Sequence, residues 1–405
     1  MEKFLSIFAL VSAVLMTALA PNYVIAQTSA AQAEQEKERD GDVDDVSASD
    51  HARKFAGAVF AMTNATAGNR IVIYGRAEHG SLTRLGSVST RGLGIGVDTD
   101  TQGVLRLSSD NRFLYAANPG SDDISVFSVS GTKLKFLQKI YAGDEPLSLT
   151  IHGNLLYVLD GSVAGNAIQG FKIAQDGTLT SLPNSFRFLS SGIAVPGDIR
   201  FSPNGRLLVV PHKGTDLLLT PPNAIDVFTV DANGYASAEP IRNASVGLRP
   251  FALAFRKDGK LAMIEAVNGG ANLSTASSYQ LNADGTLKVI SASVPNGQTD
   301  SCWLELSKDE RYAFTANFSS GTISSYNFEP SGALTLIKGA AAFLGEASEP
   351  VDLSLSADGR YLYQLLRGPG AVAAFRIEKG AELTPLGVIA GGLPVSDGAS
   401  GLAAY

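Results

Sequence analysis

The chain repeats itself with a period of roughly fifty residues from position 57 to its end, and such periods are typical of propellers or solenoids. The clearest part of the unit is a short apolar strand, a polar turn and a second apolar strand. Central Asn-Gly and Asp-Gly pairs favour the positive φ that tight hairpin turns need. This first hairpin is complete at 105–118, 147–160, 198–212, 252–266, 303–317 and 351–366.

A second hairpin follows in each unit, and its leading strand alternates apolar and polar residues, as in "ISVFSV" and "IDVFTV". Two hairpins per unit predict a four-stranded antiparallel blade. The turn of this second hairpin occurs seven times, which predicts seven blades. It reads "RAEHGSLTRL", "SVSGTKLKFL", "AQDGTLTSL", "VDANGYASA", "NADGTLKVI", "EPSGALTLI" and "EKGAELTPL".

The two ends of the repeat do not match, and the mismatch predicts how the ring closes. The first unit starts with "GAVFAMTN" at 57–64 and lacks a leading strand, while "GASGLAAY" at 398–405 is a strand with no partner. We therefore expect an all-β, seven-bladed β-propeller in which the C-terminal strand joins the first blade and removes the open sheet edges. An open β-solenoid is the alternative, but its ends would not need to meet. No alternation of helix and strand supports a parallel α/β fold.

Residues 1–26 read as a signal peptide, because the run from Phe4 to Ala20 carries no charge and Val24 and Ala26 fit the small-residue rule for cleavage. The alternative is an uncleaved membrane anchor. Residues 27–56 read as a disordered acidic linker, and 57–405 as the propeller. We therefore expect a secreted or periplasmic protein with no stable membrane insertion after cleavage. With a net charge of −7 the chain offers nothing that favours nucleic acid.

Cys302 is the only cysteine, so the chain cannot form an internal disulfide. In an exported protein such a residue is usually buried and inert. No histidine lies near it in sequence to activate a thiolate. We therefore expect a structural Cys302 rather than a catalytic one.

The blade motifs "FSPNGRLLVV" and "LSADGRYLY", the segment "GQTDSCWLELSKDERYAFTAN" and the ending "GLPVSDGASGLAAY" resemble the seven-bladed propeller lactonases. That family includes 6-phosphogluconolactonases and fungal carboxymuconate-lactonising enzymes. The resemblance covers nearly all of 57–405 and is strongest to an exported bacterial subgroup. It implies a lactone hydrolase, of the carboxylic ester hydrolase class, in carbohydrate metabolism.

The chain departs from the phosphogluconolactonase branch at two places. That branch has a histidine before the inner strand of the central blade and an Arg-His pair entering the next one. Here the first place reads Val195–Gly197 and the second reads Phe251 and Ala252, with Arg249 nearby but out of register. The family's sugar-phosphate residues are therefore missing or replaced.

Aligning the blades gives one column of residues at the end of each second strand, which should lie at one mouth of the central channel. Its members are Asn64, Asn118, Asp160, His212, Ala266, Asn317 and Leu366, with Glu265 and Arg367 beside the two apolar members. The alternative for the asparagines is that they end strands because they tolerate turns.

His212 and Glu265 are the predicted catalytic residues. His212 lies in the unusual segment "VVPHKGTD", and Glu265 ends the apolar strand "LAMIE". A carboxylate against apolar surroundings has a raised pKa that suits acid–base work. Either residue could instead be structural, His212 as a satisfied polar group and Glu265 as a surface carboxylate at a strand end.

A lactonase needs an activated water and a group that stabilises the oxyanion. Lys213 or Arg249 could supply the second group. Asp198 and Asp352 begin inner strands at matching places, and Arg200 and Arg249 could neutralise an acidic ligand or pair with these aspartates. The predicted substrate-binding residues are Lys213, Asp198, Arg249, Asn118, Asn317 and Arg367.

The sequence offers no motif for a serine nucleophile or a zinc site. An oxygen-ligated Ca²⁺ or Mg²⁺ site is unsupported by spacing, so we predict no metal and no cofactor. Two functions stay open. One is an exported enzyme that hydrolyses a lactone or an acidic sugar-derived substrate. The other is a non-catalytic propeller that binds a small ligand or a protein at the channel mouth.

Overall fold

The computed structural model describes residues 55–162, 165–214 and 223–405. The predicted signal peptide and nearly all of the predicted linker lie outside the described residues, so both stay predictions. Within the described ranges, no helix has the length and apolar character needed to cross a membrane.

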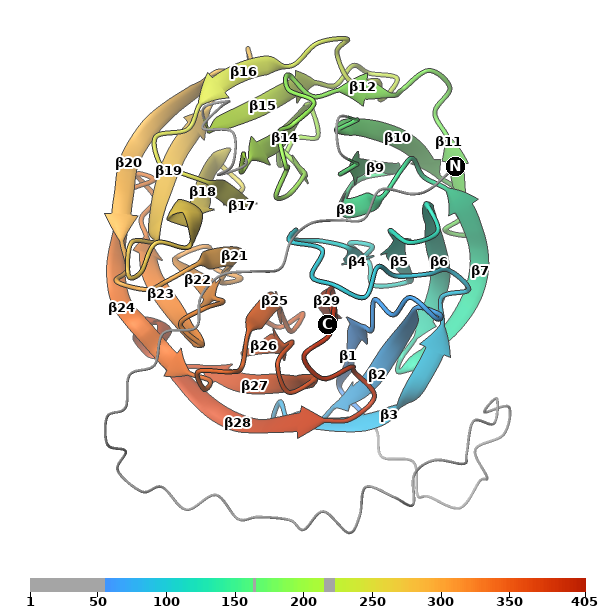
Figure 1. Cartoon of the computed structure of the whole chain (residues 1–405), viewed down its shortest axis with the longest axis vertical. Helices are drawn as coiled ribbons and strands as arrows, with labels where there is room; N and C mark the ends of the chain where they lie inside the picture. Colours follow the sequence, from blue (N-terminus) through green and yellow to red (C-terminus); the bar gives the residue numbers. More distant parts are fainter. Residues whose placement is uncertain (1–54, 163–164, 215–222) are drawn as a thin grey trace, which may run out of the picture. The chain divides into compact units, whose positions relative to one another are not determined.

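The described residues from Phe55 onward form seven antiparallel sheets, the blades, arranged in a ring (Figure 1). In each blade the first strand lies at the centre of the ring and the fourth at its rim. The first four blades are blade 1 with β29 (Leu402–Ala404), β1 (Gly57–Met62), β2 (Arg70–Arg76) and β3 (Leu82–Ser89); blade 2 with β4 (Leu105–Leu107), β5 (Phe113–Asn118), β6 (Asp123–Ser130) and β7 (Lys133–Tyr141); blade 3 with β8 (Pro146–His152), β9 (Leu155–Asp160), β10 (Ala167–Ile173), β11 (Leu179–Ser181) and β12 (Arg187–Phe188); and blade 4 with β13 (Arg200–Phe201), β14 (Leu207–His212), β15 (Ala224–Thr229) and β16 (Ile241–Ala244).

The remaining three blades follow the same order. They are blade 5 with β17 (Pro250–Phe255), β18 (Lys260–Glu265), β19 (Thr275–Leu281) and β20 (Leu287–Pro295); blade 6 with β21 (Ser301–Leu306), β22 (Tyr312–Asn317), β23 (Thr322–Phe328) and β24 (Leu334–Phe343); and blade 7 with β25 (Pro350–Leu355), β26 (Tyr361–Leu366), β27 (Ala371–Ile377) and β28 (Leu383–Ala390). Two short 3₁₀ turns, η2 (Val267–Gly269) and η3 (Lys379–Ala381), complete the regular structure of the described residues.

The ring closes as the sequence predicts. Strand β29 pairs antiparallel with β1, with Phe60 opposite Ala403 and Ala61 opposite Leu402. Two further backbone hydrogen bonds flank this ladder, from Met62 N to the Gly401 carbonyl (3.1 Å) and from Tyr405 N to the Ala58 carbonyl (3.0 Å). The seven-bladed, four-stranded propeller is confirmed. Blade 3 differs only in that its outer strand is split into β11 and β12, both of which pair with β10.

A tyrosine that recurs in the second strand links neighbouring blades through a hydrogen bond, which we call the tyrosine pin. Tyr157 in blade 3 donates its hydroxyl to the Gly234 carbonyl in blade 4 (2.7 Å), and Tyr363 in blade 7 donates to Gly80 in blade 1 (3.0 Å). Both glycines have φ near +90°, which a turn residue with a side chain adopts only under strain. The tyrosines are fully buried, so each pin satisfies a polar group inside the core between two blades.

Candidate functional site

One face of the ring carries the connections from the rim of each blade to the centre of the next, and we call it the crossover face. Among the described connections, a residue with positive φ stands directly before the first strand in four blades, and Val195 holds the corresponding place in blade 4, directly before the isolated bridge from Pro196 to His212. These residues are Glu145 (φ 60°), Val195 (45°), Arg249 (56°), Asp300 (59°) and Glu349 (46°). Four of them precede a proline, a place where extended backbone is usual. Such strain persists only where surrounding contacts enforce it, and it is common at functional sites.

A second column of residues enforces this strained geometry. The carbonyl of each strained residue accepts a hydrogen bond from the backbone N–H that follows the second strand of the same blade. Lys213 N binds the Val195 carbonyl (3.1 Å), and Arg367 N binds that of Glu349 (3.1 Å). Phe318 N binds the Asp300 carbonyl at 2.9 Å in the same way. The two columns therefore place charged and aromatic side chains around the centre of the crossover face.

The segment Val97–Gly103, between blades 1 and 2, crosses the centre of this face. We call it the hub segment, because its described contacts reach all the blades except blade 2, which it enters. Toward blades 1, 3 and 4, Thr99 N donates to Ser400 Oγ (3.5 Å), Thr101 Oγ1 donates to the Leu147 carbonyl (2.6 Å) and Gln102 N donates to the Gly197 carbonyl (2.9 Å). Toward blades 5, 6 and 7, Asp100 accepts from Arg249, Gln102 Oε1 accepts from Leu304 N (2.9 Å) and Gly103 N donates to Asp352 Oδ1 (3.4 Å).

Two aspartates of the hub segment meet three cations from different blades. Asp100 Oδ2 lies 2.6 Å from Lys213 Nζ and 3.4 Å from Arg249 Nη2. Lys213 also donates to the Asp100 carbonyl oxygen. Asp98 Oδ2 lies 3.7 Å from Arg367 Nη1. The structure therefore brings together three of the predicted substrate-binding residues, and it shows that they already hold carboxylates of the chain itself.

Aromatic rings back these cations. The Lys213 ammonium lies 4.3 Å from the centroid of the Phe251 ring, and the Arg367 guanidinium lies 4.8 Å from that of Phe318. Trp303 lies tilted against both rings and donates its indole N–H to the Thr101 carbonyl (3.1 Å). The rings exclude water from one side of each charge, which strengthens the electrostatic interactions on the other side.

The two aspartates have different environments. Burial and the neighbouring Asp100 carboxylate raise the pKa of Asp98 to about 6, against the opposing effect of Arg367 and Lys213. The Asp98 side chain is 20% exposed, so solvent still reaches it. Burial lowers the pKa of the Lys213 amine, and the Asp100 carboxylate opposes this shift. A carboxylate with a pKa near 6 is a suitable general base close to neutral pH.

The predicted catalytic residues His212 and Glu265 lie in separate networks. His212 is 1% exposed, and its Nε2 lies 2.9 Å from Asp226 in the third strand of the same blade. Asp226 in turn accepts from the Ser190 backbone N–H and hydroxyl, both at 2.7 Å. Glu265 is fully buried and accepts a hydrogen bond from Thr275. Burial raises the pKa of Glu265, against hydrogen bonds from neighbouring hydroxyl groups that lower it.

A glycine shows how tightly Glu265 is enclosed. A Cβ atom at Gly247, in the connection from blade 4 to blade 5, would lie 1.9 Å from the Glu265 carboxyl carbon. Glu265 therefore packs directly on the backbone of that connection. Its position fits a latch between a strand end and a connection, and its predicted catalytic role stays untested.

The asparagines of the predicted column are also fully buried. Asn118 donates to Asp123 (2.7 Å) and Ser125 (2.8 Å) of its own blade, and it accepts from Asn69 of blade 1 (2.9 Å). Asn317 makes the corresponding bonds to Thr322 and Ser324 (both 2.8 Å). These networks use the amide groups that a ligand would need, which favours the alternative interpretation of the asparagines as strand-end residues.

Asp198 directly follows Gly197, whose carbonyl binds the hub segment, and is fully buried. Its carboxylate is 2.8 Å from Arg200 Nε and 3.7 Å from Arg106 Nη2. Arg200 thus pairs with Asp198, one of the two predicted alternatives, whereas Arg249 pairs with Asp100 instead. Burial raises the pKa of the nearby Asp352 to about 6, although the Gly401 N–H bonds to its carboxylate (2.7 Å).

Cys302 lies beside the site and is 3% exposed. Its sulfur is 3.4 Å from Asp300 Oδ1, and burial raises the pKa of the thiol well above its usual value. A thiol in this environment is a poor nucleophile. The expectation of a buried Cys302 is confirmed.

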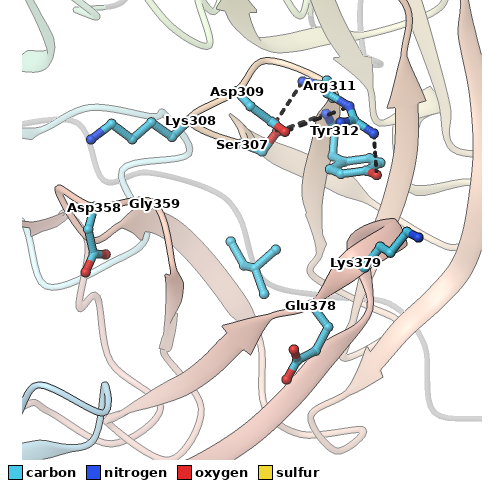
Figure 2. A pocket seen from close by; sticks show the side chains of 10 residues that line it. Ser307, Lys308, Asp309, Arg311, Tyr312, Asp358, Gly359, Glu378 and Lys379 are labelled. Atoms are coloured by element: carbon cyan, nitrogen blue, oxygen red, sulfur yellow. Dashed lines mark hydrogen bonds and ion pairs between the residues drawn. The ribbon is translucent and has the colours of Figure 1, made fainter.

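A groove of about 470 Å³ lies on the opposite face of the ring, between blades 6 and 7. Figure 2 shows Lys308 and Asp358 on one side of it and Tyr312, Glu378 and Lys379 on the other. A groove of about 280 Å³ occupies the equivalent place between blades 4 and 5. Like the first groove, it is lined by the turn after the first strand in both blades and by the turn after the third strand in the later blade. The groove is therefore a product of the repeat, and the crossover face is the more specific candidate site.

Comparison with known proteins agrees with this architecture. Residues 67–196 and 223–346 match the family described as "Lactonase, 7-bladed beta-propeller", which is more than half of the chain. The chain belongs to the seven-bladed β-propeller lactonase family. No protein among those of curated function matches this family member in sequence.

Solved structures show the same fold at low identity. A candidate 6-phosphogluconolactonase from Bacteroides fragilis shares 20% identity with a TM-score of 0.63, and the match covers 88% of this chain and 100% of that one. A periplasmic gluconolactonase from Pseudomonas aeruginosa shares 16% identity with a TM-score of 0.63, over 86% and 99% of the two chains. A similar candidate from Bacteroides uniformis shares 18%, with a TM-score of 0.65 over 86% and 99%. At these identities the likeness shows the fold alone.

The sequence prediction centred on the column of residues at the end of each second strand. The charged groups that gather on the crossover face instead come from the residues after that strand, the residues before the first strand and the hub segment. The missed residues are Asp98, Asp100, Asp300 and Glu349. A signal for two of the missed positions was present. The residue before the first strand is charged in four of the five strained crossovers, a pattern that strand formation alone does not require.

Proposed function

We propose that this lactonase-family propeller hydrolyses a lactone on the crossover face, with Asp98 as the general base. The observation that carries the proposal is the pair of neighbouring carboxylates, Asp98 and Asp100, within 4 Å of three cations. Burial raises the pKa of Asp98 to about 6, and such a carboxylate suits acid–base work near neutral pH. Family membership supplies the reaction class.

The reaction follows from these groups. Asp98 accepts a proton from water as the water oxygen bonds to the lactone carbonyl carbon. Arg249 and Arg367 stabilise the negative charge that develops on the carbonyl oxygen. When the ring C–O bond breaks, the proton on Asp98 passes to the departing alkoxide, which leaves a hydroxy acid and the ionised base.

The charge of the site favours an uncharged sugar lactone. Three cations, Lys213, Arg249 and Arg367, face four carboxylates, from Asp98, Asp100, Asp300 and Glu349. A phosphorylated or acidic lactone would therefore meet no uncompensated positive charge. The hydroxy-acid product carries a carboxylate, which the excess negative charge would help to expel.

The test is a hydrolysis assay on a panel of neutral and phosphorylated lactones with the purified protein and its Asp98→Asn variant. We expect Asp98→Asn to lower kcat/KM by about 10²-fold or more, the range for a lost general base, with little change in melting temperature. Because Asp98 must be ionised to act, activity should fall as the pH drops through about 6. Asp309→Asn, on the opposite face, is the matched control. Wild-type protein that hydrolyses no lactone, or a fully active Asp98→Asn variant, would refute the proposal.

A non-catalytic propeller that binds a small ligand is the second candidate function. The observation that favours it is that Lys213 and Arg249 are already paired with Asp100. Cations in such pairs are less available to stabilise an oxyanion during catalysis. Binding of the same lactones without turnover, measured by calorimetry, would support this candidate. Export to the periplasm or outside the cell is part of either proposal.

A further inference from the structure

Arg367 is the cation nearest to Asp98, and it is held by groups other than Asp98. Its Nε lies 2.9 Å from Glu349 Oε2, which is an ordinary charge-assisted hydrogen bond. Its guanidinium lies 4.8 Å from the centroid of the Phe318 ring. Its backbone N–H donates to the Glu349 carbonyl (3.1 Å), so both ends of the residue are tied to the same neighbour.

The distance from Arg367 to Asp98 is long by comparison. The Nη1 atom is 3.7 Å from Asp98 Oδ2, beyond the 2.7–3.2 Å that such hydrogen bonds span. A guanidinium in direct hydrogen-bond contact would favour the ionised form of Asp98 and make it a weaker base. The separation therefore matters to any proton transfer at this carboxylate.

We propose that Glu349 is a positioning residue, which holds Arg367 on the Phe318 ring and keeps its guanidinium out of hydrogen-bond contact with Asp98. This inference rests on the proposed role of Asp98 as general base. The arrangement leaves the arginine close enough to stabilise an oxyanion and leaves the carboxylate free to accept a proton. The strained φ of 46° at Glu349 is the backbone geometry that accompanies this placement.

The charged groups that act on Asp98 are Asp100 and Lys213 in addition to Arg367. Asp100 and Lys213 are paired with each other at 2.6 Å, so their opposite effects on Asp98 largely offset. Arg367 is therefore the group whose movement would change Asp98 most. If Arg367 is released from Glu349 and Phe318 and moves onto Asp98, the pKa of Asp98 should fall. If the Arg367 guanidinium is removed by substitution, the pKa of Asp98 should rise.

Three variants test the inference through the acidic limb of the pH profile of kcat/KM. Glu349→Gln and Phe318→Leu should each shift that limb to lower pH, by about one unit if Arg367 closes onto Asp98. Arg367→Met should shift the limb to higher pH. Phe318→Leu is the important member of the set, because it changes no charge and removes the ring that holds the guanidinium. The exposed Glu346 lies in the same connection, and Glu346→Gln is the matched control.

The carboxyl ¹³C titration of Asp98 by NMR provides a second readout that does not depend on turnover. Matching shifts in both measurements would support the inference. A limb that moves in Glu349→Gln but not in Phe318→Leu would show a simple charge effect and overturn it. If the wild-type protein hydrolyses no lactone, the proposed function fails, and the NMR titrations still decide whether Glu349 positions Arg367.

Discussion

Deletion of residues 398–405 should abolish cooperative folding, because this segment closes the ring. Strand β29 buries Leu402 and Ala403, which are 6% and 5% exposed, and the loss of that burial costs about 3 kcal/mol. Its backbone also pairs with β1, with hydrogen bonds at both ends of the ladder. Gly401 N donates to the buried Asp352 carboxylate (2.7 Å). About five such bonds at ~1 kcal/mol each add roughly 5 kcal/mol.

The total of roughly 8 kcal/mol is comparable to the 5–15 kcal/mol by which whole domains are stable. The deletion also leaves the edge of β1 unpaired, which invites aggregation. The assay is urea unfolding followed by the fluorescence of Trp303, the only tryptophan and 1% exposed, together with circular dichroism. The point variant Leu402→Ala is the graded control, and it should cost about 2–5 kcal/mol while unfolding stays cooperative. A deletion variant that unfolds cooperatively at an unchanged midpoint would refute the reasoning.

Two further predictions concern the site. The protein should show weak or no turnover of 6-phosphogluconolactone compared with the unphosphorylated lactone, because the crossover face holds more carboxylates than cations; equal or faster turnover of the phosphorylated substrate would contradict this. His212→Ala and Glu265→Ala should each lower the free energy of unfolding by about 1–3 kcal/mol, since each removes a hydrogen-bond partner from a buried polar group, and kcat/KM should change only a few-fold. A loss of about 10²-fold in kcat/KM without a change in melting temperature would instead assign catalysis to these two residues.

The candidate site was only partly predictable from the sequence. Lys213, Arg249 and Arg367 are identified by their places beside strand ends, and the structure brings all three to the hub segment. Asp98 and Asp100 carry no such signal, because they lie in the middle of the connection between β3 and β4 and not beside a strand end. The asparagine column shows the opposite error, since a repeated polar residue at a strand end also suits a buried turn network.

The sequence by itself determined the architecture of this protein. The fifty-residue period, the Asn-Gly and Asp-Gly turns and the two unmatched ends predict seven blades and a closed ring. Each of these features depends on local strand and turn geometry, which is the same in every repeat. The tertiary structure alone decided which side chains meet. Closing the ring brings connections from all the blades to one centre, so residues far apart in sequence, such as Asp100 and Lys213, come within 2.6 Å. No local pattern encodes that distance, because it depends on the angle between blades and on the path of a single connection across the centre.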